Sequence, residues 1–551
     1  MFMLILTSIL IVSPSFQETY AAPISSSNAT SPVVGFVPQN GDRDTLSLLF
    51  SCLLTLGLCV YSAVHLNIPP KNESVWRMRC RELQWCIIGL FGPELVVYAA
   101  WRQWSSAREL KRQVNGMSYS RETLKKSWTF GSGTITQVES KNVLIDDYTL
   151  VHGYYGTMGG FAFERDSFPK NLASEIFGQH KRLTLTPRGV ALLAQCGHLP
   201  FVSEAEIRDK NKADTVAKVL VCCQAGWMIV QVIARIAEPL PVTLLEVNTI
   251  GHVACALAMY LLWWHKPRQI NEPTRLEGEW SASLCAYMYL TSQLSGRKHH
   301  KMPLNKSSND TAAGALTCSL IHPAGLGRQE PSIEDTRPGS LSVYKLHVNE
   351  ADGSELAESP SLSHDLASRA IAAHPALKTR LMCKTHSIVN CSGCTVLTIP
   401  AEEFLAPIIS DWPTDQLLRR VDSLIMGAIL WFATIAYGAI HTAAWNSYFP
   451  STLEKWLWHA SSIYVAFSGM VWVVINVAAK IFPGIDALWM RFLHRKTFWL
   501  TDVVIILLCT ICGLAYIFSR AYLVVEAFVS LRELPKGAYE TPSWTQVLPH
   551  L

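Results

Sequence analysis

Two long apolar runs joined by a proline-containing corner dominate the pattern of hydrophobic positions between Thr215 and Trp264. Each run is about 20 residues long, which is the length an α-helix needs to cross a hydrocarbon layer of about 30 Å. The corner at Glu238–Pro241 ends the first helix, because proline lacks the N–H group and fixes φ. The pattern therefore predicts a transmembrane helical hairpin over residues 215–264.

Further apolar runs flank this hairpin on both sides. One covers residues 45–65, and three lie within residues 422–519. With the hairpin they predict an all-α polytopic transmembrane bundle of six spans, or up to eight if residues 83–101 and 520–534 also count. The last of these is shorter and carries Glu526, so it is either an interfacial helix or the continuation of the last span. Residues 520–551 are then an interfacial helix and a polar tail.

The segment 83–101 is unusual, because Gly92–Glu94 places a proline and a carboxylate at its centre. It can be a kinked span, a re-entrant segment or an interfacial helix. The basic residues that flank the spans all fall on one side if residues 102–214 and 265–421 are cytosolic, as the positive-inside rule prefers. In that arrangement residues 83–101 do not cross the membrane. We therefore favour a re-entrant or interfacial segment.

The first 44 residues have features of a secreted N-terminus. Residues 1–22 combine a short apolar run with small residues before Pro23, which predicts a signal peptide. Residues 23–44 would then be lumenal or extracellular, and Asn28 begins a glycosylation sequon. The alternative for Asn28 is a chance triplet. The predicted location is an integral membrane protein of the secretory pathway or the plasma membrane.

Composition supports the membrane class and limits the partners. The chain is 49% hydrophobic and only 16% charged, against about 25% charged for a typical soluble protein. A net charge of +4 without a long basic tract is too small to indicate nucleic-acid binding, so we expect no nucleic-acid partner. The predicted cytosolic parts are an insert at 102–214 and a loop at 265–421. The loop is rich in Ser, Pro and Gly over 296–380, which predicts that this part is largely disordered.

Several polar and charged residues lie within the predicted membrane segments. Such residues usually face the interior of a helix bundle, where they line a substrate or ion path or form hydrogen bonds between helices. We favour hydrogen bonding between helices, although His252 could change its charge near neutral pH. Arg235 and Glu246 lie close to the corner and are expected to extend toward the membrane surface. The complete set is Glu94, Gln224, Gln231, Arg235, Glu246, Asn248 and His252.

A cluster of Cys383, His386, Cys391 and Cys394 follows the predicted disordered part. Thiolate and imidazole ligands at short spacing suit tetrahedral zinc, but this spacing is not a standard zinc pattern. The alternative is a set of cysteines without metal, and we expect no other cofactor. The chain has neither an HExxH motif nor a GxSxG motif, so no catalytic residues are assigned.

Five stretches of the sequence resemble a family of uncharacterised fungal multi-pass integral membrane proteins. The resemblance covers most of the chain apart from the N-terminus and the 296–380 loop, and it implies the membrane architecture but no activity. The stretches are Tyr154–Phe163, Gly92–Gln103, Asp209–Arg235, Thr243–Pro267 and Tyr522–Trp544.

Three hypotheses for function remain open at this point. The leading one is a non-enzymatic, transporter- or receptor-like protein centred on the 215–264 hairpin, whose partners are the lipid bilayer and an unidentified small-molecule or protein ligand. The second is a membrane scaffold that docks partners through its cytosolic loops. The third is a membrane enzyme that uses His252 or the Cys/His cluster.

Overall fold

The computed structural model of the 551-residue chain is mostly helical, with short strands, which confirms the predicted helical character of the fold. The predicted signal peptide 1–22, Asn28, Cys383 and His386 lie outside the residues that the structure describes. Those residues are 32–38, 43–116, 128–130, 133–135, 148–200, 202–209, 215–295, 299–305, 317–318, 362–377, 388–391, 394–400, 403–414, 417–418, 423–485, 487 and 500–542.

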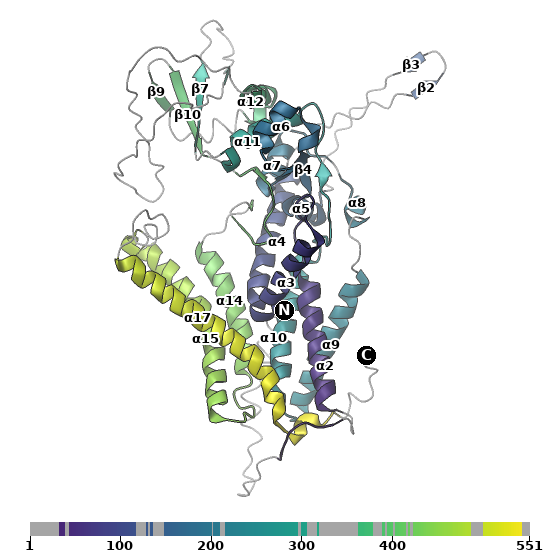
Figure 1. The fold of residues 1–551 in the computed structure, drawn as a ribbon, viewed down its shortest axis with the longest axis vertical. Coiled ribbons are helices and arrows are strands. Elements are labelled where there is room, and N and C mark those ends of the chain that lie inside the picture. Colours follow the sequence, from purple (N-terminus) through teal and green to yellow (C-terminus); the bar gives the residue numbers. More distant parts are fainter. Residues whose placement is uncertain are drawn as a thin grey trace.

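Each predicted apolar run forms a helix, and these helices make up the elongated half of the molecule (Figure 1). Among the described residues, four helices are long and apolar enough to cross a membrane, namely α10, α14, α15 and α17. The apolar stretches of α2 and α9 are shorter, and the number becomes five if one bent helix pair is counted as a span. The bounds are α2 (Thr45–Ala63), α9 (Thr215–Ala237), α10 (Leu244–Trp263), α14 (Ser423–Thr442), α15 (Thr452–Ile481) and α17 (Leu500–Val529).

The last helix differs from its predicted bounds. Helix α17 runs without a break past Ser519, so residues 520–529 continue it rather than forming a separate interfacial helix. A 3-10 turn at Ser530–Arg532 then ends the helical segment. The apolar pattern placed the end of the span at Ser519 because Arg520 follows it, but this arginine is buried inside the molecule.

The segment predicted to be broken at Gly92–Glu94 consists of two helices. The chain bends by 115° between helix α3 (Val75–Phe91) and helix α4 (Pro93–Asn115). Proline at the first position of α4 has no N–H group to lose and already has a helical φ, so it starts the new helix at this point. Helix α4 continues to Asn115, so the predicted insert does not begin at residue 102.

A compact domain with a four-stranded sheet caps one end of the helices (Figure 1). The sheet has the order β11-β5-β4-β6, in which β4 pairs antiparallel with β5 and parallel with β6. Helices from several parts of the chain pack around it, and the shared core includes Tyr155, Phe163, Leu192 and Met288. The elements are α5 (Leu150–Thr157), β4 (Phe161–Glu164), α6 (Lys170–Phe177), β5 (Arg182–Leu185), α7 (Pro187–Gln195), α8 (Glu204–Asp209), β6 (Thr274–Arg275), α11 (Ser281–Leu290), α12 (Leu362–Ala373) and β11 (Leu405–Ala406).

This sheet domain changes two predicted boundaries. The insert 102–214 is not self-contained, because β6, α11, α12 and β11 come from the chain after residue 264. Helix α12 lies inside the range 296–380, which was predicted to be largely disordered. Its buried Ala367, Ala370 and Ile371 recur at helical spacing, which gives this short helix an apolar face to pack on the domain.

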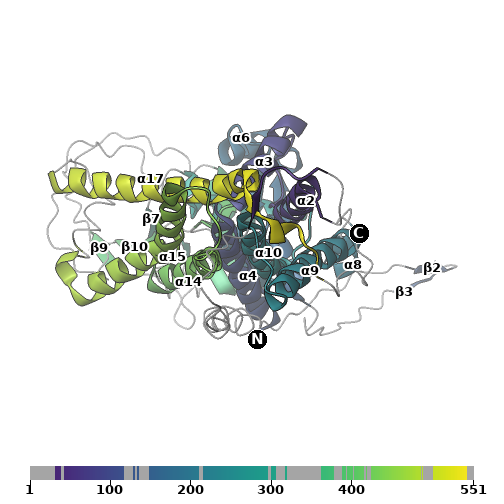
Figure 2. The ribbon, with the colours of Figure 1, turned by 90° about the horizontal axis from the view of Figure 1, so that it is seen from below.

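Helices α14 and α15 approach each other closely at two glycines. A Cβ atom added at Gly438 would lie 2.6 Å from Cα of Ala466, and one at Gly469 would lie 2.6 Å from Cα of Trp431. Glycine lets two helix backbones come together in this way. Helix α17 packs beside α15, so we treat α14, α15 and α17 as one C-terminal unit, which lies beside α2, α9 and α10 (Figure 2).

The two ends of the described chain meet at the opposite end from the sheet domain. Strand β1 (Val33–Val34) pairs antiparallel with β12 (Leu534–Pro535), and the Lys536 amide donates to the Pro32 carbonyl over 2.9 Å. The corner between α9 and α10 lies close by, because Pro241 would contact a Cβ atom at Gly537.

Candidate functional site

A buried ion pair lies at the break between α3 and α4. Glu94, in the first turn of α4, is fully buried and pairs with Arg520 of α17, which is 3% exposed. The hydroxyl of Tyr516, one helical turn before Arg520, donates to the same carboxylate. The guanidinium of Arg520 lies over the ring of Tyr437 of α14, 3.8 Å from its centroid. These contacts join the helix break to the C-terminal unit.

Asn248 and His252 of α10 extend this network toward α14. The ring nitrogens of His252 lie 2.9 Å from the Asn248 carbonyl and 2.8 Å from the Leu90 carbonyl. Leu90 is in the last turn of α3, where carbonyls have no further helical N–H partner. Since a carbonyl only accepts, the neutral ring can donate to one of the two and the protonated ring to both.

The side-chain amide of Asn248 connects these residues to a second histidine. Its Oδ1 lies 3.3 Å from the Tyr437 hydroxyl and 3.3 Å from Nε2 of His441. Its Nδ2 is buried and has no hydrogen-bond partner among the described residues. We call the whole set the polar centre; it consists of Glu94, Asn248, His252, Tyr437, His441, Tyr516 and Arg520.

The structure brings together three of the residues that the sequence singled out, Glu94, Asn248 and His252. Gln224 lies elsewhere and donates from Nε2 to Oγ1 of Thr55 over 3.1 Å, a hydrogen bond between α9 and α2. Gln231 is half-buried on α9. Arg520 was not predicted as the partner of Glu94, because it directly follows an apolar run, where a charged residue is normally exposed to water.

Arg235 and Glu246 form a separate cluster near the α9–α10 corner. Arg235 is 1% exposed, and its guanidinium donates to the carbonyls of Pro241, Gly537, Ala538 and Glu540 at distances from 2.7 to 3.1 Å. Glu246 caps the start of α10 through Thr243 and pairs with Arg43. The expectation that both would extend toward the surface was wrong, because the C-terminal tail and the residues before α2 cover them.

Lys266, which the sequence analysis did not single out, is buried where α10 meets the sheet domain. Its ammonium donates to the His65 carbonyl at 2.5 Å, to Oε1 of Gln103 at 2.8 Å and to Oδ1 of Asn67 at 3.0 Å. Three donors therefore meet three oxygen acceptors. Burial nevertheless lowers the pKa of Lys266 from 10.5 to about 7, against the opposing effect of Asp411.

This lowered pKa predicts a pH dependence of stability. Between about pH 7 and pH 10.5 the unfolded chain binds a proton at Lys266 that the folded chain does not, so stability should rise with pH across this window. The measurement is the unfolding midpoint of the detergent-solubilised protein at pH 7, 8 and 9. Lys266→Met should flatten the rise; the same slope in that variant would show that other groups cause it.

Only two of the four proposed zinc ligands lie within the residues that the structure describes. Cys391 and Cys394 are backbone partners in the antiparallel pair β9 (Ile388–Cys391) and β10 (Cys394–Pro400), while Cys383 and His386 fall outside the described residues. Within the described residues no group of three or more His, Cys, Asp and Glu side chains is placed to hold a metal ion.

Comparisons with known proteins add one finding. A family model described as a family of unknown function (DUF8562) matches residues 12–302 and 403–551, ranges that contain the whole polar centre and leave out the Cys/His cluster. No curated protein and no solved structure matches the chain. That description gives no activity, source organism or cellular location.

Proposed function

Because the chain belongs to this family of unknown function, DUF8562, we propose its function from geometry: a multi-pass integral membrane protein that acts as a proton-coupled transporter. The membrane part of the proposal rests on six helices, α2, α9, α10, α14, α15 and α17. Helix α17 supports it most directly, because it exposes a broad apolar surface that water would not tolerate. The exposed residues include Val503, Leu507, Leu508, Ile511, Leu514 and Phe518.

In this proposal α3 and α4 enter the membrane and return to the same side. The pairing of β1 with β12 keeps residues 33 and 534 on one side of the helices, which requires an even number of crossings between them. Six spans satisfy this condition, whereas a crossing by α3 and α4 would make seven. The two helices also lie near each other away from the break, since Asp411 contacts Arg81 of α3 and Gln103 of α4.

A glycosylation acceptor on a flexible spacer tests this topology. Inserted after Asn115, the acceptor should stay unmodified, because that site is cytosolic in the proposed arrangement. Inserted between α14 and α15, after Phe449, the same acceptor should be glycosylated and shows that the assay works. Glycosylation after Asn115 would mean that α3 and α4 cross, and the re-entrant arrangement would be rejected.

The polar centre is the single observation that carries the transport proposal. It lies where α10 and the α3–α4 break face α14 and α17, that is, between the C-terminal unit and the other helices. Transporters place ionisable groups at broken helices near the middle of the membrane, between units that move against each other. Glu94, His252 and His441 have titratable side chains, and the unpaired Nδ2 of Asn248 is available to a substrate oxygen.

Proton flux into proteoliposomes tests this function. Purified protein is reconstituted with a pH-sensitive dye inside, and a potassium gradient with valinomycin drives proton movement. We expect flux above protein-free vesicles, and a loss of at least tenfold in Glu94→Met/Arg520→Met, which removes both charges together. The matched control is Glu109→Gln, on the same helix in an exposed pair with Arg112, which should keep full flux. Flux equal to empty vesicles, or retained in the double variant, would overturn the proposal.

A further inference from the structure

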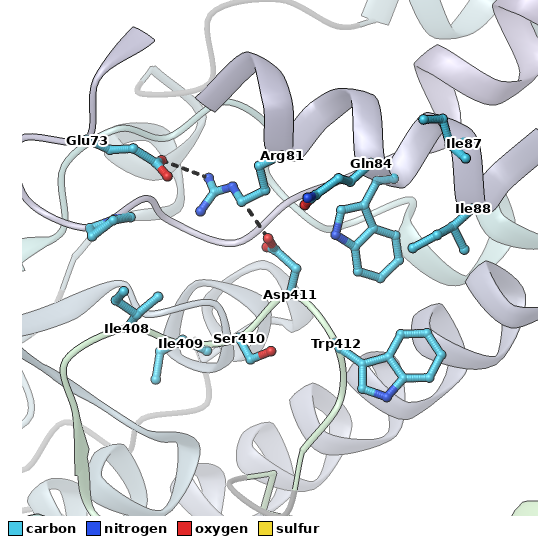
Figure 3. A pocket seen from close by; sticks show the side chains of 12 residues that line it. Glu73, Arg81, Gln84, Ile87, Ile88, Ile408, Ile409, Ser410, Asp411 and Trp412 are labelled. Carbon is cyan, nitrogen blue, oxygen red and sulfur yellow. Dashed lines mark ion pairs between the residues drawn. The ribbon is translucent and has the colours of Figure 1, made fainter. Parts of the chain in front are cut away.

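A cleft of about 700 Å³ lies between α3 and the segment that follows β11 (Figure 3). It is separate from the polar centre, and its lining changes in character from one end to the other. Glu73, Arg81 and Asp411 group at one end, whereas Ile87, Ile88 and Trp412 lie at the other.

The charged end of the cleft holds groups whose bonding is incomplete. Arg81 pairs loosely with Glu73 at 3.6 Å and with Asp411 at 3.5 Å, both longer than good hydrogen bonds. Oε2 of Glu73 and Nε of Arg81 are both buried without a hydrogen-bond partner among the described residues. Each of these two atoms therefore has a charged neighbour in a long ion pair but no hydrogen bond, which is costly unless a ligand supplies one.

The contacts around the cleft indicate how deep each of its two ends would lie in the membrane. Asp411 accepts from the Asn67 amide over 2.6 Å, and Asn67 also accepts from Lys266, just beyond the end of α10. The charged end is thus level with the ends of the long helices. Helix α3 runs from there to Leu90, which contacts His252 in the middle of α10. Ile87 and Ile88 consequently lie deeper than Arg81, and the exposed indole of Trp412 lies with them at the apolar end of the cleft.

We propose that this cleft binds a phospholipid with an ethanolamine headgroup. The primary ammonium donates to Glu73, a phosphate oxygen accepts from Arg81, and an acyl chain follows Trp412, Ile87 and Ile88 inward. A primary ammonium fits better than a quaternary one, because Oε2 of Glu73 lacks a hydrogen bond and only an N–H donor can supply it. An anionic headgroup fits poorly, since the two carboxylates outnumber the single guanidinium. A free headgroup would leave the apolar end exposed, so the occupant is the lipid.

The test is a titration of the purified protein in detergent with phosphatidylethanolamine, phosphatidylcholine or phosphatidylglycerol of the same acyl chains, read by native mass spectrometry. We expect at least tenfold tighter retention of phosphatidylethanolamine than of the other two. Glu73→Gln and Arg81→Met should each abolish this preference. Glu82→Gln, a neighbouring carboxylate on α3 that pairs with Arg79 outside the cleft, should keep it.

Two outcomes would overturn the lipid site: equal retention of the three lipids, or an unchanged preference in Glu73→Gln. The melting temperature of each variant without added lipid shows whether it is folded. The inference rests on the proposed membrane topology and is independent of proton coupling. If the acceptor inserted after Asn115 is glycosylated, the proposed topology is rejected. If that acceptor stays unmodified but the protein shows no headgroup preference, only the lipid site is rejected.

Discussion

Glu94→Met is expected to lower the free energy of unfolding by about 3–5 kcal/mol, because it leaves the guanidinium of Arg520 buried without its counter-charge. The carboxylate is fully buried, and Arg520 is 3% exposed, so solvent cannot replace the lost partner. Arg520→Met should cost a similar amount for the converse reason. The measurement is equilibrium unfolding of the detergent-solubilised variants.

The double variant Glu94→Met/Arg520→Met completes the cycle. Replacing a buried ion pair by apolar side chains of similar volume is often neutral or stabilising, so the double variant should recover most of the loss. A coupling energy of at least 2 kcal/mol is expected from the four measurements. Single variants that remain within 1 kcal/mol of the parent protein would show that water reaches the pair and that it is not buried in solution.

Arg235→Met should be comparably destabilising, by about 3–5 kcal/mol, although Arg235 acts mainly through hydrogen bonds. Its guanidinium donates to four backbone carbonyls in the α9–α10 corner and the C-terminal tail, and all of them would lose a donor at once. Arg235→Lys should rescue little of this loss, since an ammonium cannot reproduce the planar fork. Hydrogen exchange should become faster in residues 33–34 and 534–540, where β1 and β12 pair next to this cluster.

Arg532→Met serves as the matched control. Arg532 is 42% exposed and pairs with Glu454, so its loss should cost less than about 1 kcal/mol. Exchange in residues 33–34 should not change in this variant. If Arg235→Met leaves both stability and exchange unaltered, the tail is not held by Arg235.

The helical part of the fold could be predicted because long apolar runs specify helices without reference to the rest of the chain. The break at Gly92–Glu94 followed from proline chemistry in the same local way. By contrast, β6 and β11 are two residues long, and no periodicity can reveal so short a strand. Their pairing depends on partners more than 100 residues away in the sequence, and so the sheet domain was predicted as a loop and a separate insert.

The candidate site was predictable only in part, for a related reason. Polar residues inside an apolar run can be recognised from the sequence alone, as Asn248 and His252 were. Arg520 stands at the end of an apolar run, where charged residues are normally exposed to water. Its partner Glu94 is more than 400 residues earlier, so no local pattern connects the two residues. Lys266 was not singled out for a similar reason, because it stands just beyond α10, where basic residues normally flank an apolar run.

The pairing of β1 with β12 has a consequence for the order of assembly during synthesis. Val33 and Val34 are made before the first long helix, but their partners Leu534 and Pro535 are made only after the last one. Strand β1 can therefore pair with β12 only after almost the whole polypeptide has left the ribosome. This two-stranded ladder can close only after α17 has been synthesised, so its closure is a late step of folding.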